Sequence, residues 1–204
     1  MSSINIQSDF KDYYDYLADN KSKIVYKRYR NGGMQRGSAL KYLRSMGIKT
    51  IEIKPVNKFL FTDTKRVVVY TSPFLHEGKG KRVMEPQDAF NSYGNCICSK
   101  FYDSSTTVKY LQVGKRRFTL IYKKENNEEL TEGKIVDISE QKNEYNRLIG
   151  LPIFSIDYIQ DGMYMLATDF NEVENIKRLG IESLIAPDQV IEEIKNALIA
   201  YNKV

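Results

Sequence analysis

The sequence predicts one α+β domain, with a mainly antiparallel sheet and flanking helices at both chain ends. Strand-like segments are often consecutive and outnumber the helical ones, and helical periodicities occur near both termini. A chain of 204 residues is long enough to bury a substantial core without a disulfide or a metal. We therefore expect residues 1–204 to form a single domain, with a possible boundary near 124–133, where the charge changes sign.

Two helices and one strand are predicted in the first 50 residues. An apolar stripe at helical spacing predicts an amphipathic helix over 8–19, and β-like residues follow at 24–30. A second helix is predicted over about 38–46, because its leucines have helical spacing and Gly47 can adopt the left-handed conformation of a C-cap.

The middle of the chain is rich in β-branched and aromatic residues, which favour strands. Residues 74–82 interrupt this pattern with glycines and lysines, and we expect an exposed loop there. The predicted strands are Thr50–Lys54, Lys58–Thr62, Arg66–Thr71, Asn95–Tyr102, Thr106–Val113 and Arg116–Lys123.

The last two of these strands form a predicted hairpin. Gly114 at the first central position of the turn suits type II′ geometry, which sets the strand register. That register places Leu111 opposite Phe118 on an apolar face. Tyr110 and Arg117 then lie on the other face, which is polar, aromatic and basic.

The last third of the chain continues with strands and ends in a helix. Strands are predicted at 134–138, 152–158 and 163–167, and a short helix after Asn171. The final helix is predicted over about 187–201, because a proline occupies its first turn and an apolar stripe follows.

The charge of the chain is divided unequally along its length. Residues 1–124 carry 24 Lys and Arg against 10 Asp and Glu, whereas residues 125–204 carry 7 against 16. The basic part also contains 11 of the 15 tyrosines. This combination supplies cations for phosphates and aromatic faces for bases, the two contributions that binding of single-stranded nucleic acid requires.

Several classes of protein are excluded by composition. No apolar run approaches the ~18–20 residues of a membrane span, and the start of the chain lacks a secretion signal, so we expect an intracellular protein. A single histidine, His76, excludes sites that need two or more. Cys96 and Cys98 have neither zinc-site nor redox-motif spacing, and we expect two small buried residues. We expect no cofactor and no metal.

Scattered blocks of the chain share one further feature. They are the aromatic stretch 8–16, the basic segment 27–30, the central strand 113–122, Leu151-Pro152-Ile153-Phe154 and the tail 179–190. Together they resemble a family of uncharacterised proteins of large tailed bacteriophages. These blocks are structural rather than catalytic. The resemblance implies a phage origin and the cytoplasm of an infected bacterium, and it implies no activity.

The leading hypothesis is a non-catalytic protein that binds nucleic acid, with single-stranded RNA favoured over DNA. No known RNA-binding signature occurs, and tyrosines at alternating strand positions also suit a half-buried core. The candidate binding residues are Tyr26, Lys27, Arg28, Tyr29, Arg30, Lys79, Lys81, Arg82, Tyr110, Lys115, Arg116 and Arg117.

Three alternatives remain open at this stage. The opposite charges of the two parts could drive self-association or binding to another phage protein. A basic, aromatic pocket could instead sequester a nucleotide as an anti-defence protein. The weakest alternative is an enzyme, in which Gly78-Lys79-Gly80-Lys81 holds a phosphate and Asp157, Asp161 and Asp169 gather around a divalent cation.

Overall fold

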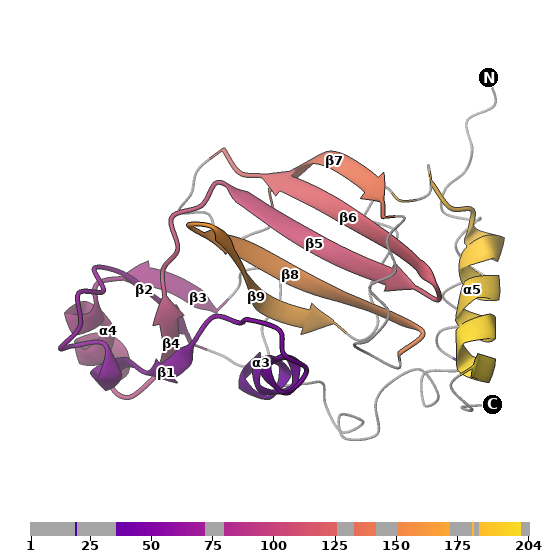
Figure 1. Cartoon of the computed structure of the whole chain (residues 1–204). Helices are drawn as coiled ribbons and strands as arrows, with labels where there is room; N and C mark the ends of the chain where they lie inside the picture. Colours follow the sequence, from indigo (N-terminus) through magenta and orange to yellow (C-terminus); the bar gives the residue numbers. More distant parts are fainter. Residues whose placement is uncertain are drawn as a thin grey trace.

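The computed structural model describes residues 19, 36–71, 80–125, 133–141, 151–171, 181 and 184–200. In these ranges the chain forms two antiparallel sheets and three α-helices, which confirms the α+β class (Figure 1). No helix in them is long and apolar enough to cross a membrane. The predicted helix over 8–19, the strand over 24–30 and the helix after Asn171 lie outside the described residues, apart from Asp19 and Asn171 themselves.

The smaller sheet has four strands in the order β1-β4-β2-β3. They span Ile53–Pro55 (β1), Val67–Tyr70 (β2), Lys81–Met84 (β3) and Ile97–Lys100 (β4). One face of this sheet packs against α4 (Pro86–Tyr93) and the short 3-10 helix η2 (Val56–Lys58). The buried side chains there are Val56, Phe59, Val67, Val69, Ala89 and Cys98.

The larger sheet has five strands in the order β7-β6-β5-β8-β9. They span Thr106–Val113 (β5), Arg116–Lys123 (β6), Lys134–Glu140 (β7), Ile153–Asp161 (β8) and Tyr164–Asn171 (β9). Because β6 and β7 pair, this sheet contains strands from both sides of the charged turn at 124–133. The number of domains stays a prediction.

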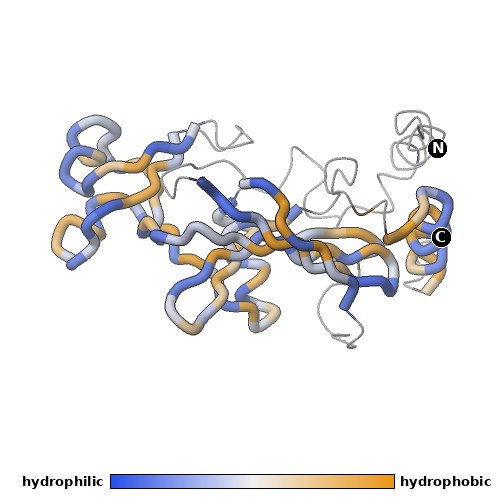
Figure 2. The backbone as a smooth tube through the Cα atoms, turned by 90° about the horizontal axis from the view of Figure 1, so that it is seen from above, coloured by the Kyte–Doolittle hydropathy of each residue, from blue (hydrophilic) through white to orange (hydrophobic). Residues whose placement is uncertain are grey.

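Helices cover both faces of the larger sheet. Side chains alternate between the two faces of a strand, so Leu111 and Phe118 lie on one face and Tyr110 on the other. The Leu111 face packs against α5 (Pro187–Ala200), along which Figure 2 shows hydrophobic and hydrophilic residues alternating. The Tyr110 face packs against α3 (Arg36–Ser45).

The locally encoded elements agree with expectation. The β5–β6 hairpin has the predicted bounds, Leu111 lies opposite Phe118, and Gly114 has a φ of 58°. Helix α3 buries Leu40 and Leu43, and Gly47 follows it with a φ of 81°.

Two predictions in the smaller sheet were wrong. The segment 58–62 is not a strand, because the N–H of Phe59 donates to Val56 O and the hydroxyl of Thr62 donates to Phe59 O, which closes two turns. The expected loop over 74–82 ends earlier, since Lys81 begins β3 and pairs with Tyr70. Helix α4 was not predicted.

Candidate functional site

A cavity of about 150 Å³ lies between the two sheets, and both sheets contribute side chains to it. The smaller sheet supplies the face opposite α4, and the larger sheet supplies the end of the Leu111 face that reaches beyond the α5 contact. The chain crosses between the sheets along the cavity at Phe101 and Tyr102. The charged side chains that line the cavity are Arg36, Lys81, Lys100, Lys109, Lys124, Asp157 and Asp169.

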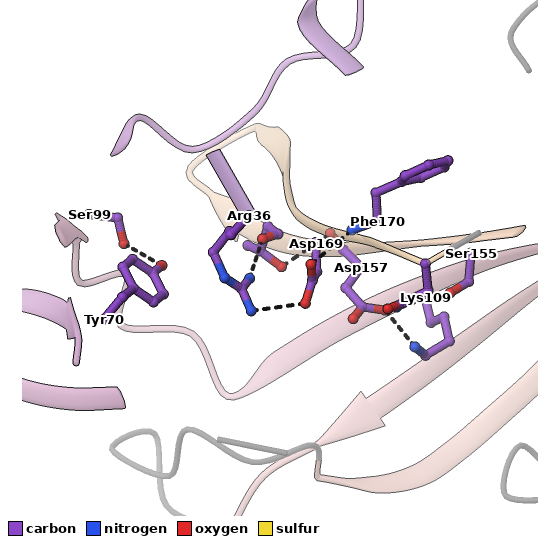
Figure 3. Close-up of polar contacts among 10 residues, drawn as sticks. Arg36, Tyr70, Ser99, Lys109, Ser155, Asp157, Asp169 and Phe170 are labelled. Atoms are coloured by element: carbon purple, nitrogen blue, oxygen red, sulfur yellow. Dashed lines mark hydrogen bonds and ion pairs between the residues drawn. The ribbon is translucent and has the colours of Figure 1, made fainter. Parts of the chain in front are cut away.

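Strand pairing places three of these charges in one row across the larger sheet. Lys109 on β5 lies opposite Asp157 on β8, which in turn lies opposite Asp169 on β9. Lys109 Nζ is 2.7 Å from Asp157 Oδ1, and the lysine side chain is only 4% exposed (Figure 3). Two carboxylates on neighbouring strands therefore point into the same cavity, with one ammonium beside them.

Arg36 completes this row from the first residue of α3. Its Nη2 donates to Asp169 Oδ2 at 2.9 Å and its Nη1 donates to the Thr168 carbonyl at 2.6 Å. The guanidinium carbon also lies 5.2 Å from the centre of the Tyr70 ring on β2. The Tyr70 hydroxyl is hydrogen-bonded to the Ser99 hydroxyl at 2.9 Å (Figure 3). Arg36 thus contacts both sheets.

Lys81 faces the cavity from β3, directly opposite Tyr70. Burial lowers the pKa of Lys81 to about 8, and the positive charge of Arg36 acts in the same direction. Burial raises the pKa of Tyr70, which therefore carries its proton at neutral pH. The cations of this cavity lie close enough together to repel one another, and an anionic ligand would reduce that repulsion.

The paired carboxylates suit one kind of metal site. The described residues contain no group of three His, Cys, Asp or Glu side chains that could enclose a metal ion by themselves. Magnesium does not need such a group, because it is commonly held by one or two carboxylates together with phosphate oxygens. Asp157 and Asp169 supply two hard oxygen ligands, and Lys81, Lys109 and Arg36 supply positive charge for phosphates, so the residues present fit a magnesium–phosphate group.

Among the residues that the structure describes, the predicted nucleic-acid residues do not come together in one place. Tyr26, Lys27, Arg28, Tyr29, Arg30 and Lys79 lie outside the described residues. Lys81 lines the cavity, whereas its neighbour Arg82 is exposed and points to the α4 face of the smaller sheet, opposite Val69.

The four remaining candidates belong to the β5–β6 hairpin, away from the cavity. Arg116 pairs with Glu140 at 2.7 Å, and the backbone N–H of Lys115 donates to Glu193 at 3.0 Å. Tyr110 packs against Phe154 on the α3 face of the sheet, and Arg117 is only 7% exposed. Each of these residues therefore makes contacts within the fold, and the four do not form a shared binding surface.

Several cavity residues were missed from the sequence. The missed residues are Arg36, Tyr70, Lys100, Lys109 and Lys124. Lys109 had a visible signal, because it occupies the same face of β5 as the buried Leu111 and Val113, where a charge needs a partner. The weakest alternative from the sequence expected Asp157, Asp161 and Asp169 to gather around a cation. The structure places Asp157 and Asp169 opposite each other in the cavity, whereas Asp161 does not line it.

The comparisons with known proteins agree on one fold. No protein family and no curated protein matches the sequence. Among solved structures, the ATP-grasp ligase PsnB, complexed with Mg, ADP and a variant of its minimal precursor, has a TM-score of 0.56 at 11% identity over 97% of this chain and 73% of PsnB. A RiPP-associated ATP-grasp ligase of Chryseobacterium gregarium, in complex with ADP and a leader and core peptide, has a TM-score of 0.57 at 10% identity over 95% and 70%.

A third structure is the macrocyclase MdnC of Microcystis aeruginosa, bound with its precursor peptide MdnA. It has a TM-score of 0.50 at 16% identity, over 78% of this chain and 58% of MdnC. PsnB and the C. gregarium ligase are described with ADP, and all three proteins are described with a precursor, leader or core peptide. None of the three is described with nucleic acid.

These likenesses correct the leading hypothesis from the sequence. A non-catalytic RNA-binding protein was expected, with nucleic acid as its partner, and the fold contradicts both expectations because it is shared with enzymes that bind ATP. Among the described basic candidates, Lys81 lines the cavity, Arg116 pairs with Glu140 and Arg117 is buried, so the basic stretches do not translate into one exposed surface there. The chain has the fold of the ATP-grasp ligases.

Proposed function

We propose that this protein is an ATP-dependent ligase that binds a magnesium nucleotide between its two sheets. One observation carries the proposal: two opposed carboxylates, Asp157 and Asp169, share a cavity with at least three cations in a fold common to ATP-grasp ligases. Structural carboxylates pair with cations on many protein surfaces. The cavity differs because its charges come from both sheets and from α3 and line one shared space.

The cavity walls divide into a polar and an apolar part. Phosphates fit beside Lys81, Lys109 and Arg36, where charge-assisted hydrogen bonds are available. The apolar part suits the face of a purine ring and consists of Ile51, Val68, Phe101, Tyr102 and Ile159. A volume of about 150 Å³ is below the ~300–1,000 Å³ of most small-molecule sites. We therefore expect the sheets to move apart slightly when a whole nucleotide binds.

A peptide is the substrate class that the comparisons support. PsnB, the C. gregarium enzyme and MdnC are each described with a precursor, leader or core peptide. A ligase joins two groups at the expense of ATP, so incubation with ATP, Mg²⁺ and a peptide substrate should release ADP and inorganic phosphate in equal amounts. We propose a peptide carboxylate as the group that is activated. The phage resemblance and the intracellular location stay predictions of the sequence.

Nucleotide binding by matched variants tests the proposal. We expect isothermal titration of the wild-type protein with ADP to show binding that requires Mg²⁺. Asp169→Asn should weaken it by roughly tenfold or more, since a lost charged ligand costs about 1.5–3 kcal/mol. Asp137→Asn is the control, because Asp137 is an exposed carboxylate on β7 of the same sheet. The proposal fails if the wild type does not bind ADP or if both variants bind it equally.

A further inference from the structure

Arg36 has one contact that a metal would replace and two that it would not. Asp169 Oδ2 accepts a hydrogen bond from the guanidinium, while Asp169 Oδ1 accepts one from the backbone N–H of Phe170 at 3.0 Å. Both carboxylate oxygens are therefore engaged. A divalent cation bound at Oδ2 must take the place of the Arg36 contact, because a cation and a guanidinium repel each other at that distance.

The remaining two contacts of Arg36 do not involve a carboxylate. The Thr168 carbonyl accepts from Nη1 at 2.6 Å, and the Tyr70 ring lies against the guanidinium at 5.2 Å. The Tyr70 hydroxyl is also hydrogen-bonded to the buried Ser99, but it is the ring face that contacts the guanidinium. Loss of the Asp169 bond would therefore leave the guanidinium anchored in the cavity, with donor groups available for another anion.

We propose that Arg36 is a nucleotide-binding residue that changes partners when a magnesium nucleotide binds. It neutralises Asp169 first, and when the metal takes that carboxylate, Tyr70 and Thr168 keep the guanidinium in the cavity to bind a phosphate. The inference rests on the proposed function and adds a role that the carboxylates alone do not imply. It also makes the contact between α3, β2 and β9 sensitive to the ligand.

The exchange predicts opposite effects of one substitution on two ligands. In Arg36→Gln, Mn²⁺ alone should bind more tightly by roughly threefold to tenfold, because a competing cation is gone. The complex of Mn²⁺ with ADP should bind more weakly by roughly tenfold, because a charged donor to phosphate is gone. Free Mn²⁺ is measured by electron paramagnetic resonance, with and without ADP. A purely structural arginine would change both affinities in the same direction.

Matched variants separate this role from a general effect on the fold. Arg44→Gln removes an exposed arginine from the same helix, one that donates only to the Thr50 hydroxyl in the contacts described, and should change neither affinity. Arg36→Lys should recover part of the binding of Mn²⁺ with ADP, because it restores the charge. Thermal unfolding of each variant confirms that it is folded before binding is measured.

Substitutions of Tyr70 test the anchoring step. Tyr70→Phe keeps the ring face and should bind Mn²⁺ with ADP nearly as the wild type does. Tyr70→Leu removes the face and should weaken that binding by roughly threefold to fivefold, the range expected from a cation–π contact. Binding of Mn²⁺ alone should stay unchanged in both variants. Equal loss in the two variants would contradict anchoring by the ring.

The outcomes distinguish the inference from the proposed function. A wild-type protein that binds no ADP with Mn²⁺ overturns the proposed function and the phosphate step together. A wild-type protein that binds it, with Arg36→Gln behaving like Arg44→Gln for both ligands, overturns the exchange alone. A weaker affinity of Arg36→Gln for Mn²⁺ without ADP also overturns it, because that result makes the arginine a supporter of the metal site rather than a competitor.

Discussion

At the scale of single residues, Lys81 is the cavity group whose charge depends most clearly on its surroundings. Burial is the main cause that lowers its pKa from 10.5 to about 8, and Arg36 and Lys124 act in the same direction. Asp169 and Asp157 act against them. The folded protein therefore loses this proton near pH 8, whereas the unfolded chain retains it up to about pH 10.5.

That difference predicts how stability depends on pH. Between about pH 8 and 10.5 the unfolded chain binds more protons than the folded one, so Lys81 makes stability rise with pH across this interval. Below pH 8 the cost of burying the ammonium is present in full. Urea unfolding should show that the free energy of unfolding of the wild type rises across this interval and that the rise is missing in Lys81→Met. Lys123→Met is the control, because Lys123 is an exposed lysine on β6, and it should keep the rise. Parallel curves for wild type and Lys81→Met would contradict this account.

The cavity was harder to predict than the core for a reason visible in particular residues. Lys109 can be recognised from the sequence as a buried charge, because it shares one face of a strand with buried aliphatic residues. Its partner Asp157 is 48 positions away in sequence, and only the pairing of β5 with β8 brings the two side chains to 2.7 Å. Arg36 gives no local sign, because its role depends on the docking of α3 against β9.

At the scale of elements, the β5–β6 turn lies in close contact with α5, and the type of turn alone does not demand this contact. A Cβ on Gly114 would lie 2.5 Å from the backbone oxygen of Glu193, and Gly114 also has a φ of 58°. Gly162, in the β8–β9 turn, has a φ of 59° but nothing within 4 Å of its Cβ position. The two glycines therefore share the backbone strain and differ in the contact with the helix.

Alanine at each glycine isolates that contact. Gly162→Ala should destabilise the protein by about 1–2 kcal/mol, the cost of a left-handed residue with a side chain. Gly114→Ala should cost about 1–3 kcal/mol more, because the hairpin or α5 must shift to admit the methyl group. Denaturant unfolding measures both values. Equal losses of stability in the two variants would show that α5 can shift away from the hairpin at no cost.

Most elements with local signals were predicted, although α4 was missed despite Pro86 in its first turn and Gly94 at its C-cap. The bounds of β5 and β6 follow from two alternating segments around one glycine turn, and α5 follows from Pro187 and an apolar stripe. The sequence of strand β3 carries little strand signal of its own, because its first residues, Lys81 and Arg82, continue a glycine- and lysine-rich segment. The strand forms through its pairing with β2. Elements that exist because of tertiary pairing escaped the sequence pattern.

At the scale of the whole molecule, the uneven charge of the sequence is partly satisfied within one chain. Among the described residues, at least three ion pairs join a cation from residues 1–124 to an anion from residues 125–204: Arg36 with Asp169, Lys109 with Asp157, and Arg116 with Glu140. Two of the three lie in the cavity between the sheets. The division of charge along the sequence therefore reflects how the cavity is assembled as well as the character of the surface.

A ligand in that cavity would connect the two sheets, and amide hydrogen exchange can detect the connection. We expect ADP with Mg²⁺ to slow exchange in β3 and β9 together, because these strands carry Lys81 and Asp169 on opposite walls. Strand β7 is an internal control, since it forms the edge of the larger sheet farthest from β9 in the strand order.

Ligand binding also stabilises the whole protein. At a hundredfold excess over Kd, binding adds about 2.7 kcal/mol of stability, enough to slow exchange through global unfolding in every strand. The informative quantity is therefore the additional protection of β3 and β9 relative to β7. Protection confined to one sheet would place the nucleotide outside the cavity.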